Sequence, residues 1–194
     1  MNPLNSVNGT IISGIVIAIV IGLVSMGVSF NVNSLLVWVH VLAGITWIGL
    51  LYYFNFVQVP ALADAASDEG GPGGSGITKY VAPRALWWFR WGAVVTWLSG
   101  AAYLMHLGIL DDAFMLNEAG FVIGVGAWLG TIMLFNVWAL IWPNQKKILG
   151  LVEASAEEIA KARKVAFIAS RTNTMLSIPM LMSMVGFGHA GFFI

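Results

Sequence analysis

The chain has 194 residues and no net charge; 59% of its residues are hydrophobic and only 9% are charged. Soluble proteins carry roughly 25% charged residues, so this composition excludes a water-soluble fold and predicts an integral membrane protein in a lipid bilayer. The zero net charge excludes a basic nucleic-acid-binding protein, and the absence of cysteine excludes disulfides, thiolate metal sites, iron–sulfur clusters and covalently attached haem.

Five apolar segments are each long enough to cross a bilayer, which takes about 20 helical residues. We therefore predict an all-α integral membrane protein with a single membrane domain, residues 1–194, in which five transmembrane helices form an antiparallel bundle. The predicted spans are about residues 11–30, 35–61, 85–110, 119–142 and 165–187. Residues 64–82 contain the run Gly-Gly-Pro-Gly-Gly-Ser-Gly, which predicts a flexible linker.

All nine cationic side chains fall on one side of this five-span arrangement. They flank the second and fourth connections, at Lys79, Arg84, Arg90, Lys146, Lys147, Lys161, Arg163, Lys164 and Arg171. Cytoplasmic loops of membrane proteins are enriched in lysine and arginine, so we expect these connections and the N-terminus to be cytoplasmic.

A helix outside the membrane is predicted over about residues 155–165, on the cationic side. Ser155 and Glu158 have the spacing of a capping box, and Glu157 and Lys161 form a favourable pair four residues apart. We expect this helix to continue without a break into the fifth span. It is either a docking surface for a partner subunit or a solvated extension that stabilises the span.

The three histidines are the candidate cofactor-binding residues, because polar groups at membrane depth are costly and usually functional. His40 lies in the second span, His106 near the end of the third, and His189 at the end of the fifth. A helical rise of about 1.5 Å per residue places all three roughly 24–30 Å from the inner ends of their spans, toward the outer face. Two imidazoles at one level on neighbouring helices are the arrangement that holds a b-type haem, which needs no cysteine.

Simpler roles remain open for these histidines. A histidine beside a loop, such as His106, is commonly a solvated interface residue. His40 has the alternative role of a hydrogen-bonding group between helices. A copper or zinc site made by all three histidines lacks a tight spacing motif.

Small and polar residues inside the predicted spans are expected mainly to pack the helices. Plain packing is favoured over clearance for a cofactor at four glycines of the fourth span, Gly120, Gly124, Gly126 and Gly130. Hydrogen bonds between helices are expected from Asn55, Asn136, Asn173, Thr174 and Ser177.

Four blocks of sequence, in order, cover most of residues 35–190 and carry a family resemblance. They are Trp-Val-His-Val-Leu-Ala-Gly-Ile-Thr-Trp-Ile-Gly at 38–49, Trp-Phe-Arg-Trp-Gly-Ala-Val-Val-Thr-Trp-Leu-Ser-Gly at 88–100, the fourth-span residues 126–133 with 136–147, and residues 170–181. Together they resemble the N-terminal membrane domain of the bacterial membrane-bound urate oxidases, or urate hydroxylases. The first block is also similar, more distantly, to the haem-binding helix of membrane protoporphyrinogen oxidases and copper-resistance D proteins.

The resemblance implies a multi-pass protein of the bacterial inner membrane that takes electrons from urate and passes them to an external cytochrome c. It implies histidines at His40 and His189, where this sequence has them, but none at His106. It also implies a histidine where this sequence has Gly124 and another near Asn173. We expect a short variant of the family, without its cytochrome c domain.

Two functions of different class follow from these observations. The first is a b-type cytochrome-like redox protein, with haem b ligated through iron by His40 and His189 and with a quinone or soluble cytochrome c as electron partner. The second is a non-catalytic accessory subunit that packs in a larger membrane complex or a homo-oligomer. A transporter ranks third, because all nine acidic residues lie in the predicted loops.

Overall fold

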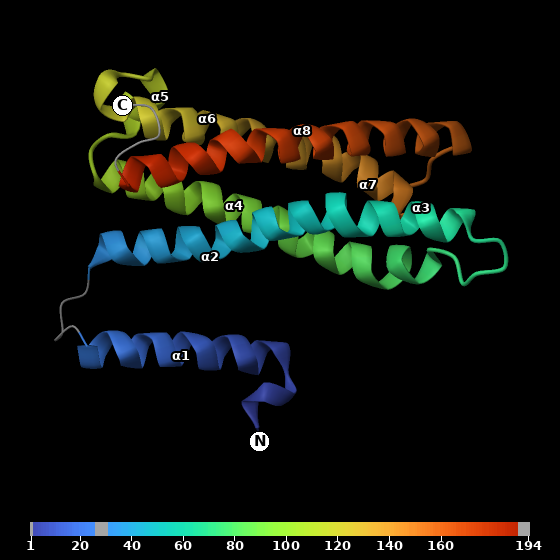
Figure 1. Ribbon diagram of the computed structural model, residues 1–194, viewed down its shortest axis with the longest axis horizontal. Helices are drawn as coiled ribbons and strands as arrows, with labels where there is room; N and C mark the ends of the chain where they lie inside the picture. The colour runs from blue at the N-terminus through green and yellow to red at the C-terminus, as the bar shows by residue number, and fades with distance from the viewer. Residues whose placement is uncertain (1, 26–30, 190–194) are drawn as a thin grey trace. The chain divides into compact units, whose positions relative to one another are not determined.

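The computed structural model describes residues 2–25 and 31–189, and every regular element in these two ranges is helical (Figure 1). The predicted all-α class is therefore confirmed for the described part of the chain. The chain forms two compact units, residues 1–32 and 33–194.

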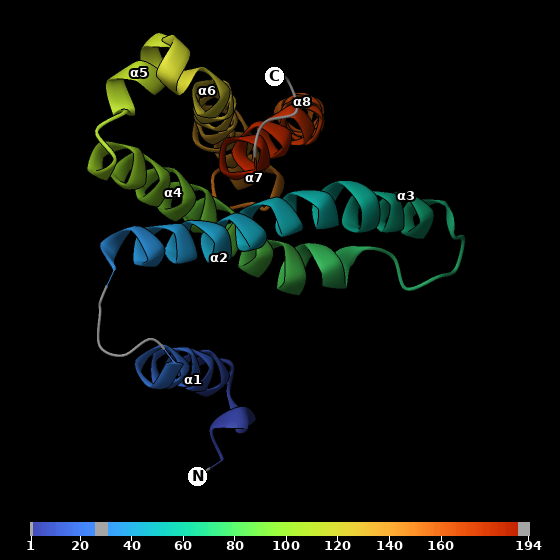
Figure 2. The same cartoon turned by 60° about the vertical axis from the view of Figure 1, so that its left-hand side comes forward.

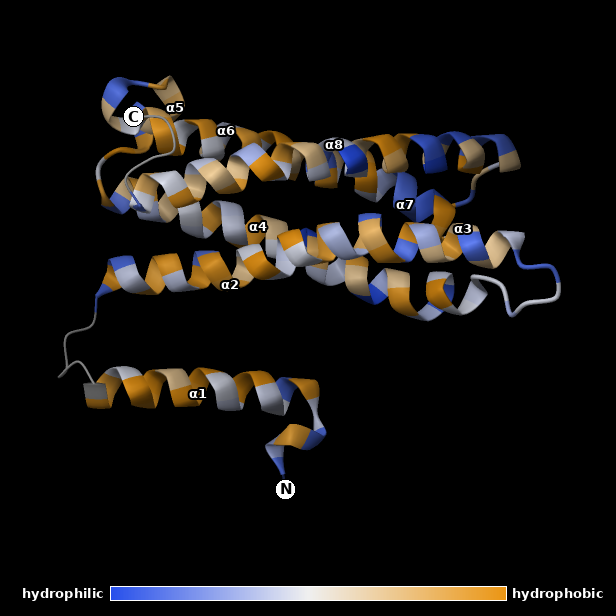
Figure 3. Cartoon of the chain, in the orientation of Figure 1, coloured by the Kyte–Doolittle hydropathy of each residue, from blue (hydrophilic) through white to orange (hydrophobic). Residues whose placement is uncertain are grey.

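The first unit is one apolar helix that follows a short 3-10 turn. The turn, Pro3–Asn5, is capped by Asn2, and helix α1 covers Val7–Ser25. It begins four residues before the predicted span, whose last residues, 26–30, lie outside the described residues. Its apolar side chains are exposed along its length. The ribbon of α1 is largely orange, the colour of hydrophobic residues, in Figure 3. Such a surface needs lipid or another protein to cover it.

The second unit is built from long helices interrupted by π-helical turns. The first two continuous stretches are α2 (Val32–Tyr53) with η2 (Phe54–Gln58) and α3 (Val59–Ser67), then η3 (Ile77–Val81) with α4 (Ala82–His106). The chain continues through α5 (Leu110–Met115), η4 (Glu118–Gly120), α6 (Phe121–Phe135), η5 (Asn136–Ile141), α7 (Trp142–Ile148) and α8 (Ala156–Gly188).

In the described ranges 2–25 and 31–189, three helices are long and apolar enough to cross a membrane, at residues 7–24, 32–67 and 118–148. Helices α4 and α8 are long enough, with 25 and 33 residues, but they are less apolar. Within the second unit α8 packs along α6 and α7, while α4 packs against α6 (Figure 1 and Figure 2). The chain therefore contains helices suited to a bilayer, and the less apolar helices α4 and α8 both pack against one of them, α6.

Two connections differ from the sequence expectation. The predicted linker 64–82 is helical at both of its ends, because α3 continues to Ser67 and η3 begins at Ile77. The reversal between them uses Gly70 and Gly73, whose φ angles of 87° and 65° are unfavourable for residues with a side chain. Between the third and fourth predicted spans the chain forms the short helix α5 rather than a plain loop.

The core of the second unit lies where α2 and α4 meet the α6–η5 stretch and α8. Its largest fully buried apolar side chains are Trp47, Leu51, Phe89, Met133 and Val137. Helices α2 and α4 approach closely at Gly92, where an added Cβ would lie 3.3 Å from the backbone nitrogen of Trp47. Small residues of this kind let membrane helices pack backbone to backbone.

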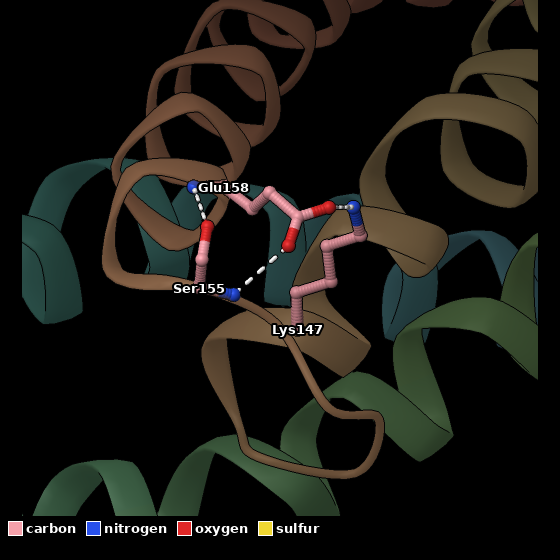
Figure 4. A network of polar contacts seen from close by, with 3 residues as sticks. All are labelled: Lys147, Ser155 and Glu158. Carbon is pink, nitrogen blue, oxygen red and sulfur yellow. Dashed lines mark hydrogen bonds and ion pairs between the residues drawn. The ribbon is translucent and has the colours of Figure 1, made fainter.

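The predicted capping box is present at the start of α8 (Figure 4). The Ser155 hydroxyl accepts a hydrogen bond from the Glu158 amide at 3.2 Å, and the Glu158 carboxylate accepts one from the Ser155 amide at 2.9 Å. Lys147 Nζ lies 3.3 Å from the same carboxylate, which links α7 to α8. As predicted, α8 then runs to Gly188 without a break, passing through Pro179.

Acidification should loosen the first turn of α8. The pKa of Glu158 is lowered by the backbone hydrogen bond from Ser155 and by the hydrogen bond and charge of Lys147. A carboxylate with a depressed folded-state pKa adds stability above its unfolded value, about 4.3, and this contribution disappears as the pH falls through the folded pKa. Hydrogen exchange should show protection of amides 157–160 that declines at acidic pH. In the control Glu158→Gln, protection should be lower at neutral pH and insensitive to acid; equal protection of both proteins at neutral pH would contradict this.

Candidate functional site

The ring of His40 is half-buried and lies against α4. Its Nδ1 is 2.8 Å from the carbonyl oxygen of Thr96. A carbonyl oxygen only accepts hydrogen bonds, so Nδ1 donates and the neutral ring keeps its lone pair on Nε2. Histidines that bind metals are typically oriented by such a bond from their second ring nitrogen. The local geometry therefore suits His40 to act as an iron ligand through Nε2.

Gly100 provides the room that this ring occupies on α4. An added Cβ at Gly100 would lie 2.9 Å from Cε1 of His40, which is closer than real Cβ contacts, and 3.0 Å from Nδ1, which is tighter than most. By contrast, an added Cβ at Gly49 would meet nothing within 4 Å. The position of the imidazole is thus set by Thr96 and Gly100 of the facing helix, which sequence reasoning had not linked to His40.

His189 directly follows the last residue of α8 and is exposed. Its Nδ1 lies 3.1 Å from the carbonyl oxygen of Val185, one turn earlier in the same helix. The same reasoning leaves Nε2 of His189 with its lone pair. The two predicted ligands are therefore both oriented by backbone carbonyls, but on different helices, and no hydrogen bond joins them in the structure as described.

His106 is the last residue of α4 and is exposed. The start of α2 and the ends of α4 and α8 all lie at one end of the second unit, on the left of Figure 1. All three histidines thus belong to helix segments near the same end. Within residues 2–25 and 31–189, no group of three histidine or carboxylate side chains could hold a metal ion, so a three-histidine copper or zinc site gains no support.

Hydrogen bonds between polar side chains also connect the helices of the second unit away from the histidine-bearing end. Asn136 donates to the Asn173 side chain at 2.8 Å, and Asn173 donates to the Met133 carbonyl at 2.9 Å. Asn55 donates to the Ser170 hydroxyl at 2.8 Å. These bonds join η2 and the α6–η5 stretch to α8, so the predicted interhelical roles of the three asparagines are confirmed.

Two more of the expected groups have different outcomes. Ser177 lies 2.9 Å from the Tyr52 hydroxyl across α2 and α8, which confirms its interhelical role. The Thr174 hydroxyl instead donates to the Ser170 carbonyl of its own helix. The prediction for Thr174 is wrong because a threonine within a helix can reach the carbonyl four residues earlier.

The two positions where the family resemblance implies further histidines serve packing in this chain. A Cβ at Gly124 would overlap the Ala113 carbonyl of α5, so no side chain fits there without moving that helix. Asn173 is fully buried and held by the two hydrogen bonds described above. Neither position offers a metal ligand.

A buried cation lies nearer the other end of α4. Arg90 is only 8% exposed, its Nε donates to the Leu86 carbonyl at 3.1 Å, and its guanidinium carbon lies 3.2 Å from the centroid of the Trp142 ring. Aromatic faces attract cations, so Trp142 replaces the missing acidic partner. Sequence reasoning treated Arg90 only as a charge flanking a loop; the tryptophans around it were the available signal.

The family model described as "Urate oxidase N-terminal" matches residues 28–122 and 110–193 of the chain. The matched ranges contain the four sequence blocks and all three histidines, and they leave α1 outside. No curated protein and no solved structure matched the chain. Since the matched ranges cover most of the chain, the resemblance found in the sequence is confirmed: the chain belongs to the urate oxidase N-terminal family.

Proposed function

We propose that this chain is a b-type cytochrome-like membrane redox protein in which His40 and His189 hold haem b. The observation that supports this proposal is the half-buried His40 imidazole, whose Nδ1 is hydrogen-bonded to the Thr96 carbonyl of α4, which leaves Nε2 available to bind a metal. His189 has the same arrangement of ring nitrogens near the same end of the unit. A non-covalent haem is also compatible with a sequence that lacks cysteine.

Each residue of the proposed site has a defined task. His40 would supply one nitrogen ligand to the iron; Thr96 holds its ring through Nδ1, and Gly100 keeps the space beside it open. His189 would supply a second nitrogen ligand. When bound, haem supplies a centre that gains and loses one electron. Family membership suggests urate as the electron source and a soluble cytochrome c as the acceptor.

Absorption spectroscopy of the purified full chain tests this proposal. The reduced-minus-oxidised difference spectrum should contain a sharp α-band, with about one haem per chain. A flat spectrum from protein produced in haem-supplied cells would favour the second candidate, a non-catalytic subunit of a larger membrane complex. That candidate is supported by Gly124 and Asn173, which pack the helices where the resemblance implies histidines.

We further propose that the chain crosses a bacterial inner membrane five times, with its N-terminus and its cationic connections in the cytoplasm. Under this proposal α4 and α8 are the two less apolar spans, and α6 shields part of their surface. The polar residues of α7 and of the first turns of α8, blue in Figure 3, then lie outside the bilayer on the cytoplasmic side.

Cysteine labelling should reveal this orientation. The chain has no native cysteine, so Ser75→Cys and Asn117→Cys each introduce a unique thiol at an exposed position. In intact spheroplasts a membrane-impermeant maleimide should label the variant at 117 but not the variant at 75, because lysine and arginine mark the cytoplasmic side. Permeabilised membranes serve as the control, in which both should react. Equal labelling of both in intact spheroplasts would contradict the orientation.

A further inference from the structure

A cavity of about 660 Å³ lies in the second unit between η2, α3, α7, the first turns of α4 and residues 163–170 of α8. Helices α3 and α7 lie on the right of Figure 1. This is the end of the unit opposite to the start of α2 and the ends of α4 and α8, in or next to which the three histidines lie. The three π-helical segments of the described ranges all contribute to its lining, through Phe54, Asn55 and Gln58 of η2, Thr78 of η3 and Ile141 of η5. Single π-helical turns are rare and occur frequently at functional sites.

Gln58 gives this cavity an unsatisfied hydrogen-bond acceptor. Its side chain lines the cavity and is 9% exposed, and its Oε1 has no hydrogen-bond partner in the described structure. The neighbouring Asn55 differs, because its amide donates to both the Leu51 carbonyl and the Ser170 hydroxyl. Buried polar groups are nearly always paired, so Gln58 requires a donor that the protein does not supply.

The remaining lining indicates the chemistry of the molecule that brings this donor. The walls are mainly apolar and aromatic; Phe54 and Phe89 meet edge to face, with ring centroids 5.4 Å apart. Arg163 also lines the cavity and forms no ion pair among the described side chains. A cation at this position disfavours an ammonium head group. The lining therefore suits an uncharged hydroxylated aromatic ring that carries an apolar tail.

We propose that this cavity binds the ring of a quinol-class lipid, with a ring hydroxyl donating to Gln58 Oε1. This inference goes beyond the proposed function, because it adds a lipid-soluble ligand to the urate and cytochrome c suggested there. The binding itself uses only the residues of this cavity. It is therefore measurable on protein with or without haem, and a flat haem spectrum leaves the result interpretable.

Calorimetric titration of the purified full chain in detergent, without oxygen, tests the proposal with decyl-benzoquinol. We expect saturable binding with one site per chain. The oxidised decyl-benzoquinone offers only acceptors and should bind roughly tenfold more weakly, which is the effect of about one net hydrogen bond. Equal affinity for the quinol and the quinone, or no saturable binding of either, would overturn the proposal.

Variants of the two glutamines in the lining separate a specific contact from general damage. Gln58→Leu should weaken quinol binding roughly tenfold, whereas Gln58→Glu retains an acceptor oxygen and should retain most of the affinity. Gln145→Leu alters the same cavity without removing the unpaired acceptor and should leave the affinity within about twofold. Quinol affinity unchanged in Gln58→Leu would contradict the contact. Displacement of the quinol by short-chain phosphatidylethanolamine at equal concentration would instead identify a phospholipid site.

Discussion

Replacing His40 by alanine should abolish the haem absorption band of the purified protein. The substitution removes the Nε2 that the Thr96 bond leaves available, and so removes one of the two proposed iron ligands from the more buried side of the site. His189→Ala should have the same effect. His106 is exposed at the end of α4, so His106→Ala should leave the band nearly unchanged. Bleaching in His106→Ala with a normal band in His189→Ala would show that the ligands are assigned wrongly.

A glycine variant tests the position of the His40 ring without altering any histidine. The added methyl group in Gly100→Ala would meet the imidazole at 2.9 Å and force it away from α4, so the haem content should fall. The matched control is Gly49→Ala, whose methyl group meets nothing within 4 Å. Absorbance of haem relative to protein gives the comparison. Equal haem content in both variants would contradict the role of Gly100.

Adding a methyl group at Gly124 should destabilise the fold by about 1–3 kcal/mol, the usual cost of overpacking. The new Cβ would overlap the Ala113 carbonyl, so α5 would have to move away from α6. Gly130→Ala is the matched control in the same helix, because a Cβ there meets nothing within 4 Å. It should be neutral or stabilising by up to about 1 kcal/mol, since alanine favours helix over glycine.

Denaturant unfolding in detergent measures both substitutions. The midpoint for Gly124→Ala should fall below that of the unaltered protein, while the midpoint for Gly130→Ala should match or exceed it. Indistinguishable midpoints for the two variants would mean that α5 does not pack tightly against α6 at this position.

The sequence predicts the helical class well because long apolar segments allow few alternatives. The capping box at Ser155 and Glu158 also fixes the start of α8 from local chemistry alone. Helix α5 could not be predicted in the same way, because its six residues are too few for an apolar period to appear. The π-helical turns were likewise missed, since one extra residue per turn leaves a continuous apolar run unchanged.

In the candidate site, too, residues with a local signal can be predicted from the sequence, whereas residues that depend on helix packing cannot. The sequence alone identifies His40 as a candidate ligand, because a histidine at membrane depth is unusual. Its partners Thr96 and Gly100 are not identified in this way, because they depend on which face of α4 turns toward α2. Arg90 illustrates the same limit: its charge suggests a loop, but Trp142 covers its guanidinium inside the helical unit.

The electron paramagnetic resonance spectrum of the oxidised, unaltered protein tests the central claim most directly, because it reports both the iron and its axial ligands. We expect a low-spin ferric haem signal of the kind given by two imidazole ligands, at about one haem per chain, and its loss in His40→Ala. No ferric haem signal in protein from haem-supplied cells, or a signal that survives unchanged in His40→Ala, would contradict the assignment of His40 as a haem ligand.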